Sequence, residues 1–327
     1  MLPPFLQLRT TSTESFYDAV FEHSSPVGAI RALWWSAACV GAVPSTVLLF
    51  LPGNPGILDF YTPFLGALHV KDKSGTLAIM AHSHIGHSPE LDYQHSRQST
   101  SYSLPAQIQG ALEAYDAVRR YYGQAKIVLA GHSVGAWIAL QVLKARHADV
   151  NAVFLLFPTI AQISKTPNGQ KLSPLFVPTV RYVLSALSYC TRILPDALLS
   201  MFFVAWPASQ ISALRRLLGS PQTIWAALTM ADHEMQVIKE LDIPLLTEND
   251  HRLYFYFAEQ DDWVGEYRDE ILKSLGPEPG SVKVVFGPRD IPHDFCINHG
   301  EQLASQCHRW LEKAHIPFVI NRNNCDE

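Results

Sequence analysis

Short apolar runs alternate with longer amphipathic stretches over much of the chain, and this alternation predicts its secondary structure. The runs predicted as strands are residues 46–51, 77–81, 126–130, 152–157, 253–258 and 282–286. The stretches predicted as helices between them include residues 59–69, 105–122 and 136–143. Strands that alternate with helices form a mostly parallel sheet with helices on both faces. The pattern therefore predicts a doubly wound α/β fold.

The alternation stops between residues 164 and 249, where apolar stretches are broken by prolines. In a fold of this kind, an insertion after the strand that ends near Phe157 covers the active site as a cap. The predicted parts are listed in chain order: an N-terminal segment with no assigned structure (1–45), the α/β core (46–163 and 250–315), the helical, apolar cap (164–249, inserted in the core) and a C-terminal tail (316–327).

The pentapeptide Gly131-His132-Ser133-Val134-Gly135 lies between the strand at 126–130 and the helix at 136–143. The two glycines allow a sharp turn, and the serine hydroxyl then stands above the positive end of the following helix. Gly-x-Ser-x-Gly also occurs by chance in unrelated chains, so the flanking strand and helix carry the interpretation. Ser133 is the candidate nucleophile.

A serine nucleophile needs a base and an acid, which in this arrangement follow in the order serine, acid, histidine. The strand at 253–258 runs into a loop with two acids, Asp261 and Asp262. Acid loops of this fold commonly read Asp-x-x-Val, and Val264 completes that pattern for Asp261. Asp261 is therefore preferred, with Asp262 as the alternative.

Several histidines could supply the base. His293 follows the strand at 282–286 on a loop, whereas His251 precedes both the acid and its strand. His299 and His308 fall in the final amphipathic helix, where solvation or a helix cap explains them. His293 is the predicted base, and an ordinary loop histidine is the alternative interpretation.

An oxyanion hole requires two backbone N–H groups that point toward the developing negative charge. One is predicted from Val134, directly after the nucleophile. The other should lie in the loop after the strand at 46–51, where Asn54 is the best donor because Pro55 has no N–H. A plain Pro/Gly turn would give the same composition.

These segments together resemble the lipid droplet-associated hydrolase family of the α/β-hydrolase superfamily. The residues that carry the resemblance are Leu51-Pro52-Gly53-Asn54-Pro55-Gly56, the pentapeptide around Ser133, residues 154–160, Pro167-Asn168-Gly169, Asp261-x-Trp263 and Ile291-Pro292-His293-x-Phe295. The resemblance implies an α/β-hydrolase fold, a serine hydrolase with Ser133, Asp261 and His293 in the triad positions, and a location on lipid droplets and the endoplasmic reticulum. It also implies a lipid ester substrate, with sterol esters as the proposed kind.

Composition and charge limit the domain organisation, the possible partners and the compartment of the protein. The 327 residues, 48% of them apolar, allow one large domain with an insertion. A net charge of -5 gives no basic face for nucleic acid. Five scattered cysteines are typical of reduced thiols on the cytosolic side, and the first residues lack the pattern of a secretory signal. No cofactor and no metal are expected.

The cap contains the strongest indication of membrane contact. Two apolar stretches within residues 175–206 flank a short turn, but neither reaches the roughly 20 residues that cross a bilayer. We therefore expect a hairpin embedded in one leaflet or a droplet monolayer. The residues expected to contact lipid are Tyr182, Leu184, Phe202, Phe203 and Trp206. A cap packed against the core would bury the same residues and stays open as an alternative.

A second apolar run, residues 32–51, contains no charged residue. Its latter part is needed as the first core strand, and Pro44 would break a helix, so we do not expect it to span a membrane. Trp34 and Trp35 are left as candidates for lipid contact.

Two other functions are weighed against an esterase. The sequence His82-Ser83-His84-Ile85-Gly86-His87 approaches a metallohydrolase motif, but Gly86 stands where that motif needs an acid. A catalytically weak lipid-droplet scaffold could keep the hydrolase fold for binding. The ordered set of Ser133, Asp261 and His293 favours chemistry, so the sequence predicts an ester hydrolase at lipid surfaces.

Overall fold

The computed structural model describes residues 1–10, 15–24, 26–39, 43–91, 102–193, 195–275 and 283–314, so the predicted tail at 316–327 lies outside the described residues. The strands are β1 (Gln7–Thr10), β2 (Tyr17–Glu22), β3 (Ala29–Trp35), β4 (Thr46–Leu51), β5 (Leu77–His82), β6 (Lys126–His132), β7 (Val150–Leu156), β8 (Leu253–Phe257) and β9 (Val284–Phe286). The α-helices are α1 (Thr62–Lys71), α2 (Leu104–Tyr121), α3 (Val134–Ala145), α4 (Pro167–Leu172), α5 (Pro178–Ser188), α6 (Asp196–Phe202), α7 (Ala208–Leu218), α8 (Pro221–Val237), α9 (Ile243–Glu248), α10 (Tyr267–Ser274) and α11 (Gly300–Lys313). Short 3₁₀ helices cover Leu58–Tyr61, Ile163–Lys165, Ser173–Phe176, Tyr189–Ile193 and Asp250–Arg252.

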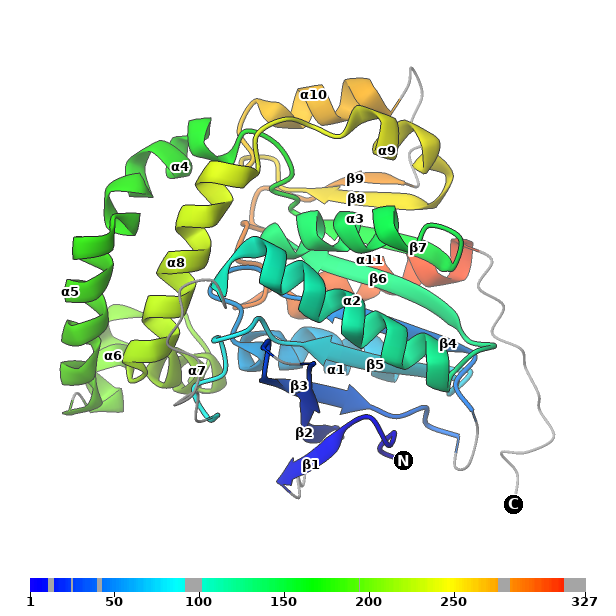
Figure 1. Ribbon diagram of the computed structural model, residues 1–327, viewed down its shortest axis with the longest axis horizontal. Coiled ribbons are helices and arrows are strands. Elements are labelled where there is room, and N and C mark those ends of the chain that lie inside the picture. Colours follow the sequence, from blue (N-terminus) through cyan, green and yellow to red (C-terminus); the bar gives the residue numbers. More distant parts are fainter. Residues whose placement is uncertain are drawn as a thin grey trace.

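Within the described residues, the strands form one sheet in the order β1-β2-β3-β5-β4-β6-β7-β8-β9 (Figure 1). The strands from β5 to β9 in this order run parallel, and β1, β2 and β3 add antiparallel partners at one side. The predicted α/β class with a mostly parallel sheet is confirmed.

The N-terminal segment, to which the sequence assigned no structure, supplies the antiparallel strands β1 to β3. β3 pairs with β5, with Trp34 opposite Met80. Trp34 and Trp35 are 1% and 0% exposed, which removes both as candidates for lipid contact. Trp34 belongs to the apolar layer that includes α2 and Trp35 to the layer that includes α1, and the Trp34 indole stacks on Tyr122 with ring centroids 5.9 Å apart. These indoles are core residues.

Side chains of the parallel strands divide between two apolar layers. In β4, Val47 and Leu49 point toward the layer with α2 and α3, whereas Leu48 and Phe50 point toward the layer with α1 and α11. Strands covered on both faces read as continuous apolar runs, which explains why the sequence revealed them. The carboxyl ends of these parallel strands meet at one edge of the sheet, where the loops with the candidate residues lie.

The helices α4 to α8 form the part beyond this edge, at the left of Figure 1. There α5 packs on α8, and α6 packs on α7. Arg181 of α5 is buried, with its guanidinium 3.5 Å from Asp232 and 5.4 Å from the centroid of the Trp225 ring. Arg181 is the charged residue within the first apolar stretch of residues 175–206, and its charge is balanced by Asp232 of α8. Among the described residues, no helix has both the length and the apolar character to cross a membrane.

Candidate active site

Ser133 occupies the turn between β6 and α3 in a strained conformation, with φ of 54° and ψ of -123°. A Cβ atom at Gly131 would overlap the backbone of Gly135, and one at Gly135 would overlap the backbone of Leu51. Only glycine fits at both positions, which is why the turn can be this sharp. The turn holds the serine hydroxyl above the edge of the sheet, at the start of α3.

Ser133, His293 and Asp261 form one chain of hydrogen bonds, although they lie far apart in the sequence. The Oγ of Ser133 is 3.0 Å from Nε2 of His293, and Nδ1 of that ring is 2.8 Å from Oδ2 of Asp261. The Asp261 side chain is 6% exposed and that of His293 is 16% exposed. This is the geometry in which an imidazole can take the serine proton while a carboxylate orients the ring.

The acid loop selects Asp261 over its neighbour. Its second oxygen, Oδ1, accepts hydrogen bonds from the backbone N–H groups of Trp263 at 2.9 Å and Val264 at 3.3 Å. These bonds fix the carboxylate so that Oδ2 faces the imidazole. Asp262 is exposed. The other histidines considered lie elsewhere: His251 is exposed beside Asp250, and His299 and His308 lie at or within α11.

The loop after β4 lies directly against the turn that bears the serine. A Cβ atom at Gly53 would lie 3.1 Å from the Cβ of Ser133. Val134 begins α3, so its N–H has no partner within the helix. Across the part of the chain that the structure describes, the N–H groups of Asn54 and Val134 have no acceptor. Both predicted oxyanion donors therefore lie beside Ser133 with a free N–H.

A buried histidine that the sequence analysis did not single out links these loops. His132 Nε2 lies 2.9 Å from the carbonyl oxygen of His293, and its Nδ1 lies 2.8 Å from the hydroxyl of Tyr61. The backbone N–H of Gly53 donates to the same hydroxyl at 3.0 Å. A carbonyl can only accept, so Nε2 carries the proton and Nδ1 accepts from Tyr61. Burial holds the pKa of His132 well below its usual value, which keeps the ring neutral for both roles.

The histidines considered as metal ligands bond to separate partners. His82 faces His23 at 3.2 Å, His84 Nε2 lies 2.8 Å from the Pro52 carbonyl oxygen, and His87 Nδ1 lies 2.6 Å from that of Pro55. Burial lowers the pKa of His84 to about 4 and that of His87 to about 3, so both are neutral donors at pH 7. Among the described residues, no group of three His, Cys, Asp or Glu side chains could hold a metal ion. His84 and His87 instead hold the loop after β4 in place through its backbone carbonyl groups.

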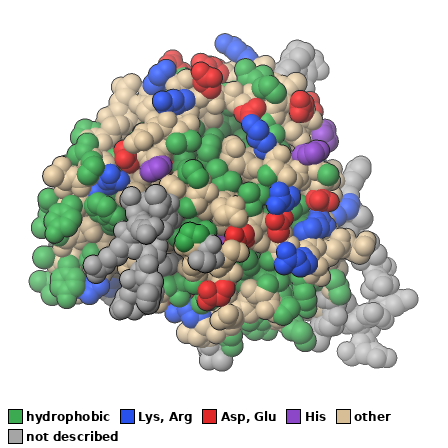
Figure 2. Space-filling model, viewed as in Figure 1, with side chains coloured by type: hydrophobic (Ala, Val, Ile, Leu, Met, Phe, Trp, Pro, Cys, Tyr) green, Lys and Arg blue, Asp and Glu red, His purple; other side chains and the backbone are tan. Residues whose placement is uncertain are grey.

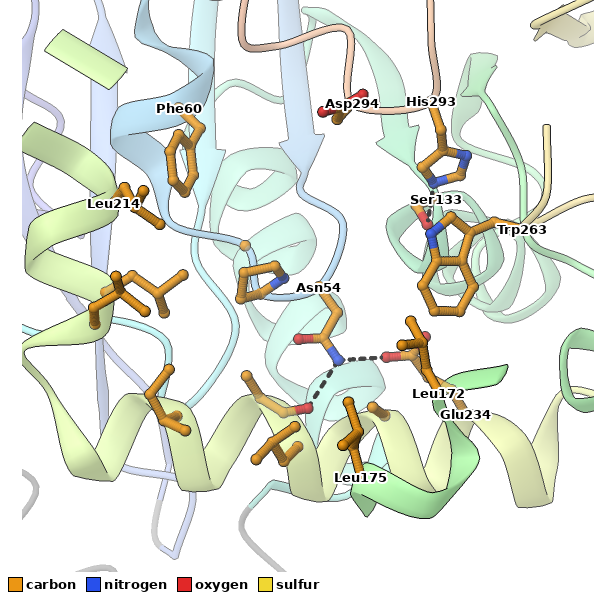
Figure 3. Close-up of a pocket in the computed structure, with 18 of the residues that line it drawn as sticks. Asn54, Phe60, Ser133, Leu172, Leu175, Leu214, Glu234, Trp263, His293 and Asp294 are labelled. Carbon is orange, nitrogen blue, oxygen red and sulfur yellow. Dashed lines mark hydrogen bonds between the residues drawn. The ribbon is translucent and has the colours of Figure 1, made fainter. Parts of the chain in front are cut away.

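A cavity of about 710 Å³ opens above Ser133 and His293, between the sheet edge and the helices α4 to α8, which we call the cap (Figure 3). Its size falls within the range of ligand pockets. Most of its lining is apolar and comes from α4, α5, α7 and α8, including Leu172, Leu184, Leu214, Leu217, Leu228 and Met235. The polar side chains near Ser133 include Asn54, Glu234 and His293. Such a site suits an apolar molecule with one polar, reactive group.

The structure divides the five residues expected to contact lipid. Tyr182 and Phe202 are exposed, at 70% and 77%. Leu184 instead lines the cavity. Phe203 and Trp206 are half-buried and pack on each other, and the Trp206 ring also contacts Phe60. For Leu184 the expectation needs correction, because the packing of α5 on α8 turns this side chain toward the cavity. For Phe203 and Trp206 lipid contact stays a prediction.

Comparison with known proteins identifies the family of this chain. The family model described as "Lipid-droplet associated hydrolase" matches residues 44–296. The chain belongs to the lipid droplet-associated hydrolase family. Relatives that carry the family name include proteins of Pongo abelii (30% identical, covering 80% of this chain and 83% of the relative), Mus musculus (28%, 82% and 85%) and Drosophila melanogaster (26%, 79% and 86%).

Solved structures show the same fold at low sequence identity. A bacterial membrane phospholipase A matches with a TM-score of 0.61 and 16% identity, over 92% of this chain and 87% of that one. A putative lipase from Acinetobacter baumannii AYE matches with a TM-score of 0.60 and 16% identity, over 95% and 92%. The predicted α/β-hydrolase fold and the hydrolase family are thus confirmed.

Sequence reasoning missed three residues that complete this site: His132, Tyr61 and Glu234. His132 stands inside the pentapeptide, so its position beside the serine could have drawn attention. Tyr61 and Glu234 carry no local signal, because each meets its partner only in the folded chain. Glu234 Oε1, on α8, accepts a hydrogen bond from the Asn54 side chain at 2.8 Å.

Proposed function

We propose that this protein is a serine ester hydrolase that acts on lipid esters, sterol esters among them, at the cytosolic face of lipid droplets and the endoplasmic reticulum. One observation carries the proposal: the hydrogen-bonded chain of Ser133, His293 and Asp261 opens onto a large apolar cavity. Family membership supports hydrolysis and the droplet location.

The first half of the reaction forms an acyl-enzyme. His293 Nε2 takes the proton of the Ser133 hydroxyl as the oxygen attacks the ester carbonyl, and Asp261 stabilises the imidazolium. The N–H groups of Asn54 and Val134 donate to the oxyanion of the tetrahedral intermediate. His293 then gives its proton to the alcohol oxygen as the carbon–oxygen bond breaks, and the alcohol leaves.

The second half repeats these steps with water. His293 accepts a proton from water, the hydroxide attacks the acyl carbonyl, and the same N–H groups hold the second oxyanion. Collapse of this intermediate returns the proton to the Ser133 oxygen and frees the carboxylic acid. No cofactor takes part. The apolar walls contributed by the cap match the hydrocarbon of a lipid ester, while the reactive carbonyl lies beside Ser133.

The outer surface of the cap supports the lipid-surface part of the proposal. Apolar side chains gather at the left edge of Figure 2, where Figure 1 places α5 and α6. We call this surface the outer cap face; its exposed members are Tyr182, Val183, Tyr189, Ile193, Met201, Phe202 and Val204. Large exposed apolar patches are typical of membrane or partner contact. Within the described residues, Cys190, Cys296 and Cys307 take part in no disulfide, which supports a cytosolic location.

Labelling with a fluorophosphonate tests the proposed nucleophile without a known substrate. We expect the label on Ser133 and none on Ser133→Ala, which should also lose turnover of an activated ester by about 10⁴-fold or more. The circular dichroism spectrum of the variant should stay that of the folded protein. A folded wild-type protein that binds droplets but neither labels nor hydrolyses esters would favour the scaffold instead. Label on another serine would refute the assignment.

A further inference from the structure

The side chain of Asn54 ties the oxyanion loop to the cap. Its Nδ2 donates to the carbonyl oxygen of Ala227 at 2.9 Å and to Oε1 of Glu234 at 2.8 Å, and both acceptors belong to α8 (Figure 3). A primary amide has two N–H bonds, so both are used and the amide plane is fixed. Because the proposed oxyanion donor is the backbone N–H of the same residue, these bonds also restrain its direction.

Glu234 is buried without a cationic partner. It is 5% exposed, and no ion pair joins it to a Lys, Arg or His within the described residues. Burial raises the pKa of its carboxyl to about 8. The carboxyl is therefore largely protonated at pH 7, and its carbonyl oxygen still accepts the Asn54 hydrogen bond.

No titratable group around Glu234 forms an ion pair with it among the described residues. Those that line the same cavity are Tyr61, His132, His293, Asp294 and Cys296. Burial lowers the pKa of His132 and raises the pKa values of Tyr61 and Cys296, so these three are uncharged at pH 7. On the elements packed against α8, Arg181 of α5 is paired with Asp232, and Arg216 of α7 is paired with Asp59. Lys165, in the 3₁₀ helix Ile163–Lys165, has no ion pair to Glu234 among the described residues.

A neutral acid is what catalysis requires at this position. The oxyanion would develop beside Asn54, in a cavity with apolar walls where charges are poorly screened. A carboxylate on the other side of Asn54 would repel that negative charge and raise the barrier. A neutral carboxyl supplies the same acceptor for the amide without the repulsion. The fold therefore lets the cap hold an oxyanion donor at little electrostatic cost.

We propose that Glu234 is a positioning residue, which in its protonated form orients Asn54 and so the oxyanion hole. This inference rests on the proposed serine hydrolase function. It also gives the cap a role in the reaction itself, because Glu234 belongs to α8 whereas Asn54 belongs to the core. Removal of the side chain should lower kcat more than it raises KM, since the oxyanion exists only after attack.

The test is the pH dependence of kcat/KM on a soluble activated ester from about pH 6 to 10, for wild type, Glu234→Gln and Glu234→Ala. Wild-type activity should fall on the alkaline side with an apparent pKa near 8. Glu234→Gln should lack this fall, because an amide keeps the acceptor and does not ionise. Glu234→Ala should lose about tenfold or more in kcat below pH 8, where the wild-type carboxyl is protonated.

Glu240→Gln is the matched control, since Glu240 is exposed just beyond α8 and should leave the alkaline fall in place. Melting temperatures at each pH separate loss of activity from unfolding. An alkaline fall that persists in Glu234→Gln, or one that is absent from wild type, would overturn the inference. Fluorophosphonate labelling tests the serine hydrolase function separately from the role of Glu234. If wild type is labelled at Ser133, the proposed function stands even when the pH profiles contradict the role of Glu234.

Discussion

The sheet edge and the cap are both rich in apolar residues, yet they use them differently. In β4, β5 and β8 every side chain is buried, and the polar groups at the edge are joined by hydrogen bonds between distant loops. In α5, by contrast, Arg181 and Ser188 are buried, while Tyr182 and Val183 remain exposed. The core therefore sets the geometry of a few atoms, whereas the cap presents apolar surface on two sides.

This difference assigns the chemistry to the core and the contact with lipid to the cap. A displacement of the Ser133 hydroxyl from His293 would stop proton transfer, so the core must be rigid. The cap helices need only offer hydrocarbon to the cavity on one face and to lipid on the other, so their composition matters more than the position of any one atom. Substitutions in the two regions should consequently fail in different assays.

The largest expected effect is loss of catalysis in the core. Asp261→Asn and His293→Gln should each lower kcat/KM on a soluble ester by about 10⁴-fold, because the imidazole loses its orientation or the proton acceptor is gone. Binding to droplets should not change, since neither residue lies on the outer cap face. Steady-state kinetics and a droplet flotation assay on the same preparations measure the two properties.

Asp262→Asn is the control for the acid, because Asp262 is the exposed neighbour that the sequence left as an alternative. It should keep nearly all activity. If Asp262→Asn were the more damaging change, the acid loop would have to rearrange in the working enzyme, and the core would not be the rigid region described above.

The core strands could be predicted from the sequence, but the first three strands could not. The strand β4 reads Thr-Val-Leu-Leu-Phe-Leu and is buried throughout, which makes it a simple apolar run. In β3, Arg31 interrupts the apolar pattern. Its guanidinium binds Asp18 of β2 at 3.0 Å and Asp59 at 2.6 Å. A buried charge looks like a surface residue until its partners are known, and these partners come from other parts of the chain.

The candidate site shows the same limit. Ser133, Asp261 and His293 could be predicted because each follows a recognisable strand, and parallel strands bring such loops to one edge. Tyr61, His132 and Glu234 could not, since their roles depend on contacts such as that between His132 and the His293 carbonyl. In the cap, the sequence indicated apolar helices but not which face of α5 would turn inward, because that depends on how α5 packs on α8.

The second largest expected effect is on the pH dependence of stability, and it concerns Glu234, which joins the cap to the core through Asn54. Its pKa is raised from 4.5 to about 8 in the folded protein, so the folded state keeps a proton that the unfolded state releases between these values. Stability from this group is therefore complete below about pH 4.5 and is lost as the pH rises toward 8. Glu234→Gln removes the dependence, so its stability relative to wild type should grow over that interval by a few kcal/mol.

Urea unfolding at several pH values measures this difference directly. Comparison of the two proteins cancels every other group that titrates, so only Glu234 contributes to the change in the difference. A constant difference between pH 5 and 8 would mean that the carboxyl is ionised in the fold, and the junction between cap and core would then be charged.

The smallest expected effect is on droplet binding by the outer cap face, because many residues share that contact and each contributes only a part of the affinity. Phe202→Asp and Tyr182→Asp should each weaken binding to triacylglycerol droplets by about tenfold, since burial of a large side chain in lipid contributes roughly 1.5–3 kcal/mol. Both positions are exposed, so the melting temperature and the turnover of a soluble ester should change little.

Leu184→Asp supplies the contrast, because Leu184 belongs to α5 like Tyr182 but lines the cavity. A charge there is desolvated without a partner, so this variant should lose thermal stability and turnover while any folded fraction still binds droplets. Measuring flotation, melting temperature and turnover for all three variants separates the two faces. If Tyr182→Asp and Phe202→Asp floated with droplets as well as wild type, the outer cap face would not be the lipid contact. If Leu184→Asp alone lost binding while it stayed folded and active, α5 would have to turn its cavity side toward lipid, and the division between the two cap surfaces would be reversed.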